Sequence, residues 1–113
     1  MRSIESALKA LADKNRLRIL ALLGEKKMCV CELAYVLKAT QPNISKHLRK
    51  LEAVDLIRAE QDSFWTNYSV IKPPNSYLRI ILEQFKKEDF HFSDLERAKK
   101  ANRKNLCCKR KRK

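Results

Sequence analysis

The sequence predicts a mostly α-helical fold with one small β-hairpin. Its 113 residues suffice for one domain with a modest core. The chain has only one Gly and three Pro, the residues that most often interrupt helices and mark turns. Apolar residues recur at helical spacing over most of the chain, and two β-prone runs lie close together between residues 56 and 70. Little loop is therefore expected.

Two helices are expected at the amino terminus. Ser3 is a good cap for a first helix with apolar residues at helical spacing, and Asp13 is expected to end that helix and cap the next. The second helix carries the apolar run 19–23, and Gly24 fits the left-handed residue that commonly ends a helix. Both helices should pack inward.

A helix-turn-helix pattern follows. Residues 26–28 favour a short connecting strand, and the apolar positions in 31–37 predict a helix of about two turns. Lys38 and Ala39 make the turn, and Thr40 is a good cap for a helix from Gln41 to Ala53 with Pro42 in its first turn.

This last helix has the layout of a helix that reads DNA. Ile44, Leu48 and Leu51 form its buried stripe, and at 100° per residue the polar residues fall on the other side. His47 lies at the edge of the stripe and suits a packing or phosphate-contacting role better than a metal ligand. The candidate DNA-binding residues are Gln41, Asn43, Ser45, Lys46, His47, Arg49 and Lys50.

The two β-prone runs, 56–61 and 64–70, are separated by Asp62 and Ser63, a two-residue turn signal. They should form the wing of a winged helix-turn-helix. After Pro73 and Pro74, residues 77–85 predict a helix whose broad apolar stripe suits a dimer seam together with the first helix. A capping-box pattern at 93–96 predicts the start of the last helix.

The net charge of +13 is concentrated at the carboxyl end. Residues 97–113 hold ten Lys or Arg and no acid, so residues 1–96 have a net charge of only +3. We therefore expect a DNA-binding and dimerisation domain over 1–96 and a basic, Cys-containing helix or tail over 97–113. The tail fits phosphate binding, an anionic membrane surface or a solvated segment without a partner.

The longest apolar run is five residues, far below the ~20 that a membrane span needs, and no secretory signal is visible. A cytoplasmic location without membrane contact is expected. The four cysteines are then expected to be thiols or metal ligands rather than structural disulfides.

Cys29 and Cys31 are the candidate metal ligands. Cys29 stands at an N-cap-like position with Glu32 three residues later, and Cys31 falls in the first turn. On a regular helix the two side chains lie ~200° apart, so chelation requires an extended start. The alternative is that both are small buried hydrophobic residues.

Cys107 and Cys108 are adjacent, and their Cα atoms at ~3.8 Å are closer than a disulfide prefers. Among basic neighbours they are either reactive thiolates or thiols without a role.

The segment from residue 10 to residue 70 resembles the ArsR/SmtB family of winged helix-turn-helix repressors. Cys-Val-Cys-Glu-Leu at 29–33 looks like the inducer site of the arsenite- and cadmium-sensing members. The other matching motifs are Ala-Leu-Ala-Asp at 10–13, Arg-Leu-Arg-Ile-Leu at 16–20, Gln-Pro-Asn-Ile-Ser-Lys-His-Leu at 41–48 and the wing residues 65–68.

The resemblance implies a homodimer that represses an inverted-repeat operator in double-stranded DNA until a metal or metalloid binds. As(III) or Sb(III) comes first because trigonal thiolate ligation suits these ions, and Cd(II), Pb(II) or Zn(II) second because four thiolates make a tetrahedral site. The best-known arsenite pattern has a third Cys where this chain has Ala34. We expect Cys107 or Cys108 to supply the missing thiolate.

Two other functions are considered. One is a thiol-redox regulator of the same fold, in which Cys29 and Cys31 oxidise without metal. The other is an enzyme, which the sequence disfavours because it has no Cys-x-x-Cys, no phosphate-binding Gly loop and no nucleophile with an evident base.

Overall fold

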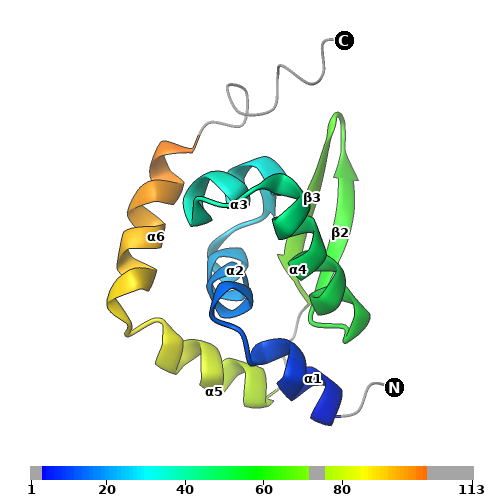
Figure 1. Cartoon of the computed structure of the whole chain (residues 1–113), viewed down its shortest axis with the longest axis vertical. Helices are drawn as coiled ribbons and strands as arrows, with labels where there is room; N and C mark the ends of the chain where they lie inside the picture. The colour runs from blue at the N-terminus through cyan, green and yellow to red at the C-terminus, as the bar shows by residue number, and fades with distance from the viewer. Residues whose placement is uncertain (1–3, 72–75, 102–113) are drawn as a thin grey trace.

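The computed structural model describes residues 4–71 and 76–101 and has the predicted fold class (Figure 1). The other helices are arranged around the central helix α2, and a three-stranded antiparallel sheet with strand order β1-β3-β2 lies to one side of them. In chain order the elements are α1 (Ile4–Leu11), α2 (Lys14–Glu25), β1 (Met28–Cys29), α3 (Val30–Leu37), α4 (Gln41–Ala53), β2 (Ile57–Asp62), β3 (Trp65–Val70), α5 (Ser76–Phe85) and α6 (Asp89–Lys100).

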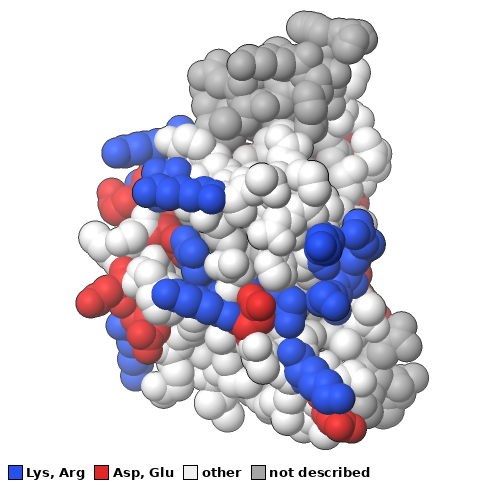
Figure 2. Space-filling view, in the orientation of Figure 1, with Lys and Arg blue, Asp and Glu red and all other residues white. Residues whose placement is uncertain are grey.

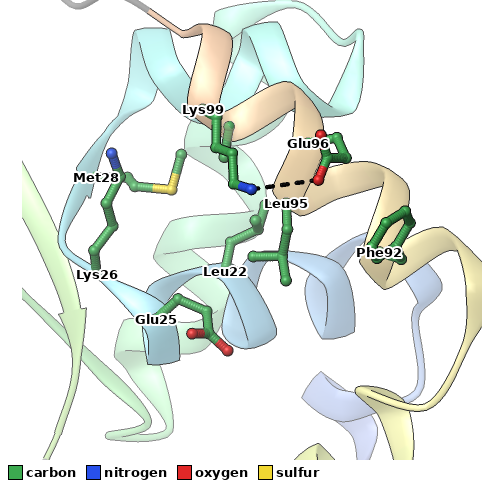
Figure 3. Close-up of a pocket in the computed structure, with 9 residues that line it drawn as sticks. Leu22, Glu25, Lys26, Met28, Phe92, Leu95, Glu96 and Lys99 are labelled. Carbon is green, nitrogen blue, oxygen red and sulfur yellow. Dashed lines mark hydrogen bonds and ion pairs between the residues drawn. The ribbon is translucent and has the colours of Figure 1, made fainter.

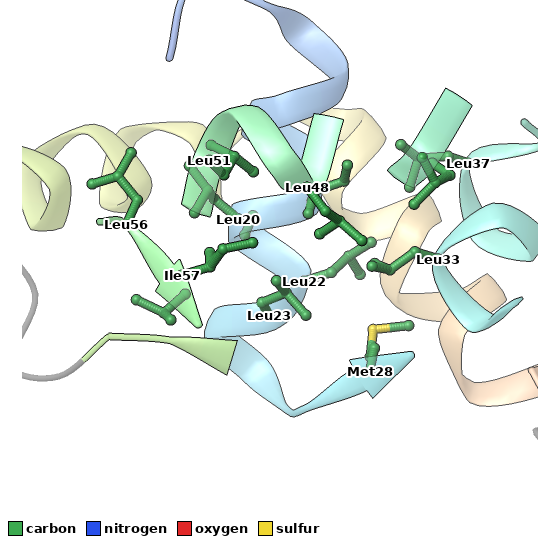
Figure 4. Packing of buried hydrophobic residues seen from close by; sticks show 14 of the residues in the cluster. Leu20, Leu22, Leu23, Met28, Leu33, Leu37, Leu48, Leu51, Leu56 and Ile57 are labelled. Carbon is green, nitrogen blue, oxygen red and sulfur yellow. The ribbon is translucent and has the colours of Figure 1, made fainter. Parts of the chain in front are cut away.

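The core is built around α2. All five residues of its apolar run, Ile19 to Leu23, are buried. Figure 4 shows how leucines of α2 and α4 pack beside Leu33 and Met28, with Leu56 and Ile57 at the start of the wing. Fully burying an aliphatic side chain contributes about 1.5–3 kcal/mol, so this helix organises the domain.

The predicted helix-turn-helix is confirmed. Asp13 caps α2 by accepting a hydrogen bond from the backbone N–H of Arg16, at 3.1 Å. The turn between α3 and α4 passes through Lys38, which has left-handed backbone angles. Thr40 Oγ1 accepts the backbone N–H of Asn43 at 3.3 Å, so α4 begins where the sequence predicted.

The wing differs from the prediction by one residue. Asp62 pairs with Trp65 in the β2–β3 ladder, so the two-residue turn is Ser63–Phe64 rather than Asp62–Ser63. Ser63 supplies the left-handed conformation, with φ of 60°. The aromatic ring of Phe64 therefore stands at the wing tip, where it is 68% exposed.

The prediction that Gly24 ends α2 in a left-handed conformation is wrong. Among the described residues no Gly has positive φ, and α2 continues to Glu25. Lys26 follows in an extended conformation, with its backbone N–H bonded to the carbonyl of Leu22 at 3.2 Å. The helix thus passes directly into β1 without the tight turn that a left-handed Gly would make.

The predicted start of the last helix at residue 93 is also wrong. Helix α6 begins at Asp89, after the N-cap Glu88, and runs without interruption past residue 96. Asp94 therefore lies in the middle of α6 and not in its first turn. Its buried carboxylate accepts two hydrogen bonds from Arg18 of α2, at 2.7 and 2.9 Å.

The apolar stripe of α5 faces the domain's own core more than a dimer seam. Leu78, Leu82 and Phe85 are all buried within the chain. What remains exposed on this side is Ile80, at 61%, while Ile4 and Leu8 are exposed on α1. The predicted cap Ser3 lies outside the described residues. Separately, none of the described helices is long and apolar enough to cross a membrane.

We predict that Asp94→Asn lowers the free energy of unfolding by about 2–4 kcal/mol, because it leaves the largely buried Arg18 guanidinium without its counter-charge. Urea unfolding monitored by circular dichroism measures this value. Glu96→Gln, on the exposed side of the same helix, is the control and should change stability by less than about 0.5 kcal/mol. Equal stabilities of the two variants would contradict a structural role for the buried pair.

Candidate functional site

The outward face of α4 presents most of the predicted DNA-binding side chains together. Asn43, Lys46, Arg49 and Lys50 are exposed, and Gln41 is half-buried at the amino-terminal end. Ser45 and His47 are also half-buried. Figure 2 shows Lys and Arg side chains gathered over the part of the surface where Figure 1 places α4. A helix with this distribution has the shape and charge to enter a major groove.

His47 departs from this face, because its ring is directed toward α2. Its Nδ1 atom lies 3.3 Å from a guanidinium nitrogen of Arg16. Burial lowers the pKa of His47 below its usual value, and the charge of Asp13 opposes that shift, whereas nearby cations add to it. The imidazole is therefore neutral at physiological pH.

The two cysteines at the start of α3 lie in one buried cluster with Trp65. Cys29 is the N-cap residue and has extended backbone angles, φ −96° and ψ 172°, so it stands outside the helix while Cys31 lies in the first turn. The Glu32 carboxylate accepts the backbone N–H of Cys29 at 3.0 Å. The extended start that chelation requires is present, and both cysteines are 3% exposed.

The oxidation states of the two cysteines differ. Cys29 carries a thiol, whereas Cys31 is disulfide-bonded, so the expectation that the cysteines are thiols or metal ligands rather than disulfides is wrong for Cys31. The predicted ligands Cys107 and Cys108 lie outside the described residues. Ala34, which stands where the arsenite pattern has its third Cys, is buried. Within residues 4–71 and 76–101, no three His, Cys, Asp or Glu side chains gather as a metal site.

The cysteine pair is attached to the wing, which the sequence did not reveal. Cys29 pairs with Asn67 in the β1–β3 ladder, and the Asn67 amide donates a hydrogen bond to the Asp62 carboxylate near the wing tip, at 3.2 Å. Trp65, which covers the cysteines, packs edge-on against Phe64 with ring centroids 6.2 Å apart. In the sequence, only the predicted short strand near Met28 hinted at this pairing. A local pattern of that kind cannot show which distant strand it pairs with, here one about 40 residues later.

Arg97 was counted with the basic tail but has a structural role. Its guanidinium donates to the backbone carbonyls of Tyr35 and Val36 at the carboxyl end of α3, and lies 4.6 Å from the centre of the Tyr35 ring. Carbonyls in the last turn of a helix lack the usual i+4 donor, and the Tyr35 carbonyl also accepts the backbone N–H of the C-cap Lys38 at 3.3 Å. Through these hydrogen bonds, Arg97 links α6 to the carboxyl end of α3, the helix that contains Cys31.

A groove of about 340 Å³ lies between α2, β1 and α6, next to the strand that leads to Cys29 (Figure 3). Its walls are mostly apolar, with Leu22, Met28 and Leu95 inside, and Lys99 and Glu96 pair across its edge at 3.4 Å. No Cys or His lines it, so it is separate from the thiol pair.

Comparison with known proteins places this geometry in a family. Residues 13–59, from the cap of α2 into β2, match the model described as bacterial regulatory protein, arsR family. The arsenical resistance operon repressor of Bacillus subtilis is 38% identical over 71 residues, which cover 62% of this chain and 68% of that protein. The chain belongs to the ArsR family. It is a transcriptional regulator with a DNA-binding winged helix-turn-helix, and not an enzyme.

Two further proteins are similar to this chain. An uncharacterised HTH-type transcriptional regulator of Methanocaldococcus jannaschii is 41% identical over 56% of this chain and 72% of its own length. The crystal structure of NolR from Sinorhizobium fredii superposes with a TM-score of 0.64 at 30% identity, over 74% of this chain and 81% of that one.

We predict that Trp65 limits access to the cysteine pair. In a reduced Cys107→Ser, Cys108→Ser background, Trp65→Ala should raise the rate of reaction of Cys29 and Cys31 with a disulfide reagent at least about fivefold, because it uncovers both sulfurs. Phe92→Ala removes a ring from an exposed position of α6 and is the control. Equal rates for all three proteins would show that Trp65 does not cover the site.

Proposed function

We propose that this ArsR-family regulator is a repressor that binds its operator as a homodimer and releases it when As(III) or Sb(III) binds to cysteine thiolates. The observation that carries the proposal is the Cys29–Cys31 pair, buried as one cluster at the start of α3 and paired through β1 to the wing. A ligand at this point would contact β1, which is paired with the wing, and α3, which packs against α4, so it lies next to both parts proposed to meet DNA.

The donor set suits a thiophilic ion. Two sulfurs at the amino end of a helix are favoured as thiolates by the partial positive charge there, and thiolate is the form that binds metal. Soft thiolate ligands select As(III), Cd(II) or Zn(II) rather than Mg(II) or Ca(II).

Cys107 or Cys108 is proposed to complete the site, because Ala34 leaves a trigonal metalloid one thiolate short. Arg97 fixes the last turns of α6 against α3, and Cys107 follows Lys100 by seven residues, a reach of up to ~24 Å. With four thiolates the same residues suit Cd(II), Pb(II) or Zn(II) instead.

A homodimer is proposed because apolar residues remain uncovered on the described helices. Ile4 and Leu8 on α1, Ile80 on α5 and Phe92 on α6 are all exposed. In such a two-fold dimer, the two copies of α4 would need to lie about 34–36 Å apart to meet successive major grooves of the operator.

A second candidate function is thiol-redox regulation by the same fold, and the disulfide at Cys31 favours it. Oxidation of Cys31 and binding of an ion to Cys31 exclude each other. A titration of the fully reduced protein therefore separates the two functions: ion-dependent operator release without oxidant supports the metal sensor, and release only with peroxide supports the redox sensor.

We predict different effects of two substitutions on α4. Arg49→Ala should weaken binding to every DNA sequence and reduce the salt slope by about one unit, because an exposed Arg here meets phosphate. Gln41→Ala should change sequence preference instead, because this residue lies at the end of α4 that enters the groove. Fluorescence anisotropy with operator and random duplexes at several salt concentrations measures both. A uniform effect of both variants would contradict this division.

We predict that Cys31→Ser abolishes induction but leaves repression intact, and that Cys107→Ser with Cys108→Ser weakens or abolishes induction. Thiolate-to-ion absorbance during titration with As(III), Cd(II) or Zn(II) reports binding. Trp65 provides a second signal, since it is the only Trp in the chain and packs on the site. Operator release should follow both signals. A wild-type response from the double tail variant would rule out the tail ligands.

A further inference from the structure

We propose that Arg16 and His47 form a positioning pair that holds α4 at a fixed orientation to α1 and α2, and that His47 acts through Arg16 rather than by binding DNA phosphate. The inference rests on the proposal that α4 reads the operator. In this role, His47 sets the angle of α4 and thereby the angle at which the other side chains of α4 meet the bases.

The guanidinium of Arg16 connects three helices. Its side chain is only 12% exposed. Its Nε atom donates to the carbonyl of Ala10, at the end of α1, where helix carbonyls lack an internal partner. One terminal nitrogen lies 3.3 Å from Nδ1 of His47 on α4, and the same nitrogen is 3.9 Å from the carboxylate of Asp13.

The chemistry of this contact fixes the state of the imidazole. Arg has only hydrogen-bond donors, so Nδ1 of His47 must be the acceptor and the ring must be neutral with its proton on Nε2. Protonation of His47 would remove the acceptor and set a second cation against Arg16. The pair therefore exists only while His47 is neutral, and falling pH breaks it.

Most of the charged groups around His47 are cations, which disfavour its protonation. Arg16 faces it from α2, Lys46 and Lys50 flank it on α4, and Lys9 of α1 lines the same shallow groove as Arg16 and Lys50. Asp13 is the one acidic group in the described surroundings that favours the charged imidazole. Its carboxylate is already used to cap α2 through the backbone N–H of Arg16.

A phosphate contact and a positioning contact predict opposite pH dependences. A histidine on phosphate binds DNA of any sequence more tightly when it is protonated. A histidine that positions α4 loses operator affinity on protonation, because the recognition side chains lose their common orientation, while affinity for random DNA does not fall. The ratio of operator to random affinity therefore distinguishes the two roles.

The test uses the reduced full-length chain, with operator and random duplexes, from pH 8 to pH 5.5. His47→Asn keeps an acceptor close to the place of Nδ1 but does not titrate, and His47→Leu has no acceptor. Arg79→Met, at an exposed position of α5, is the charge control for Arg16→Met. His91, the other histidine of the chain, is unchanged in every variant, so a difference in pH dependence between variants cannot come from it.

For the wild type we expect the operator-to-random ratio to fall about tenfold as the pH decreases below 6.5, the size expected for a charge-assisted hydrogen bond. His47→Asn should keep a ratio within about threefold of the wild type at pH 7.5 and show no fall. His47→Leu and Arg16→Met should have the low ratio at every pH, and Arg79→Met the wild-type profile.

Three results would overturn the inference. They are tighter wild-type binding to both duplexes at low pH, a uniform loss of affinity in His47→Asn, or a wild-type ratio in His47→Leu. Thermal unfolding of each variant identifies any that fail to fold, and His47→Asn keeps the test decisive if Arg16→Met does so. If the wild type shows no operator preference at any pH, it is the proposed function that fails.

Discussion

Burial of the apolar run Ile19 to Leu23 on α2 is the constraint on which the rest of the structure depends. A helix that is apolar around most of its circumference must be covered on every side, and here α1, α4, α5, α6 and the sheet cover it. The polar residues that begin the same helix then become its connectors. Arg16 reaches α4 and Arg18 reaches α6, so two charged side chains two positions apart contact different parts of the domain.

Local signals in the sequence predicted the helix-turn-helix well because its caps act within three or four residues. The start of α4 was predicted from Thr40 and Pro42, and its buried face from the stripe at Ile44, Leu48 and Leu51. The start of α3 was predicted from the spacing of Cys29 and Glu32. Each of these signals works through backbone hydrogen bonds of a single turn, which are the same whatever packs around them.

The features that the sequence did not predict depend on contacts between distant segments. Residues 93–96 have the pattern of a capping box, but α6 begins at Asp89, four residues before it. The carboxylate of Asp94 instead binds Arg18, which lies 76 residues earlier in the chain. The turn of the wing moved by one residue because β2 and β3 pair one position further. Likewise, His47 was expected to meet phosphate or to pack, and only the packed structure places Arg16 beside it.

The placement of charge suggests how the domain divides affinity from specificity. On the wing, Glu60 pairs with Lys27 and Asp62 accepts from Asn67, with Phe64 at the tip, while Arg58 of β2 is exposed. If the proposed function holds, contacts to the DNA backbone come from the exposed cations of α4, from Arg58 and from whatever the basic residues 97–113 add without regard to sequence. Specificity in such a protein depends on the angle of α4 more than on the number of its charges. A small displacement transmitted from Cys29 through β1 to the wing, or from Cys31 through α3 to α4, would therefore change operator affinity far more than affinity for random DNA. A coupling of ~1–3 kcal/mol between ion and operator is within the range of such a mechanism.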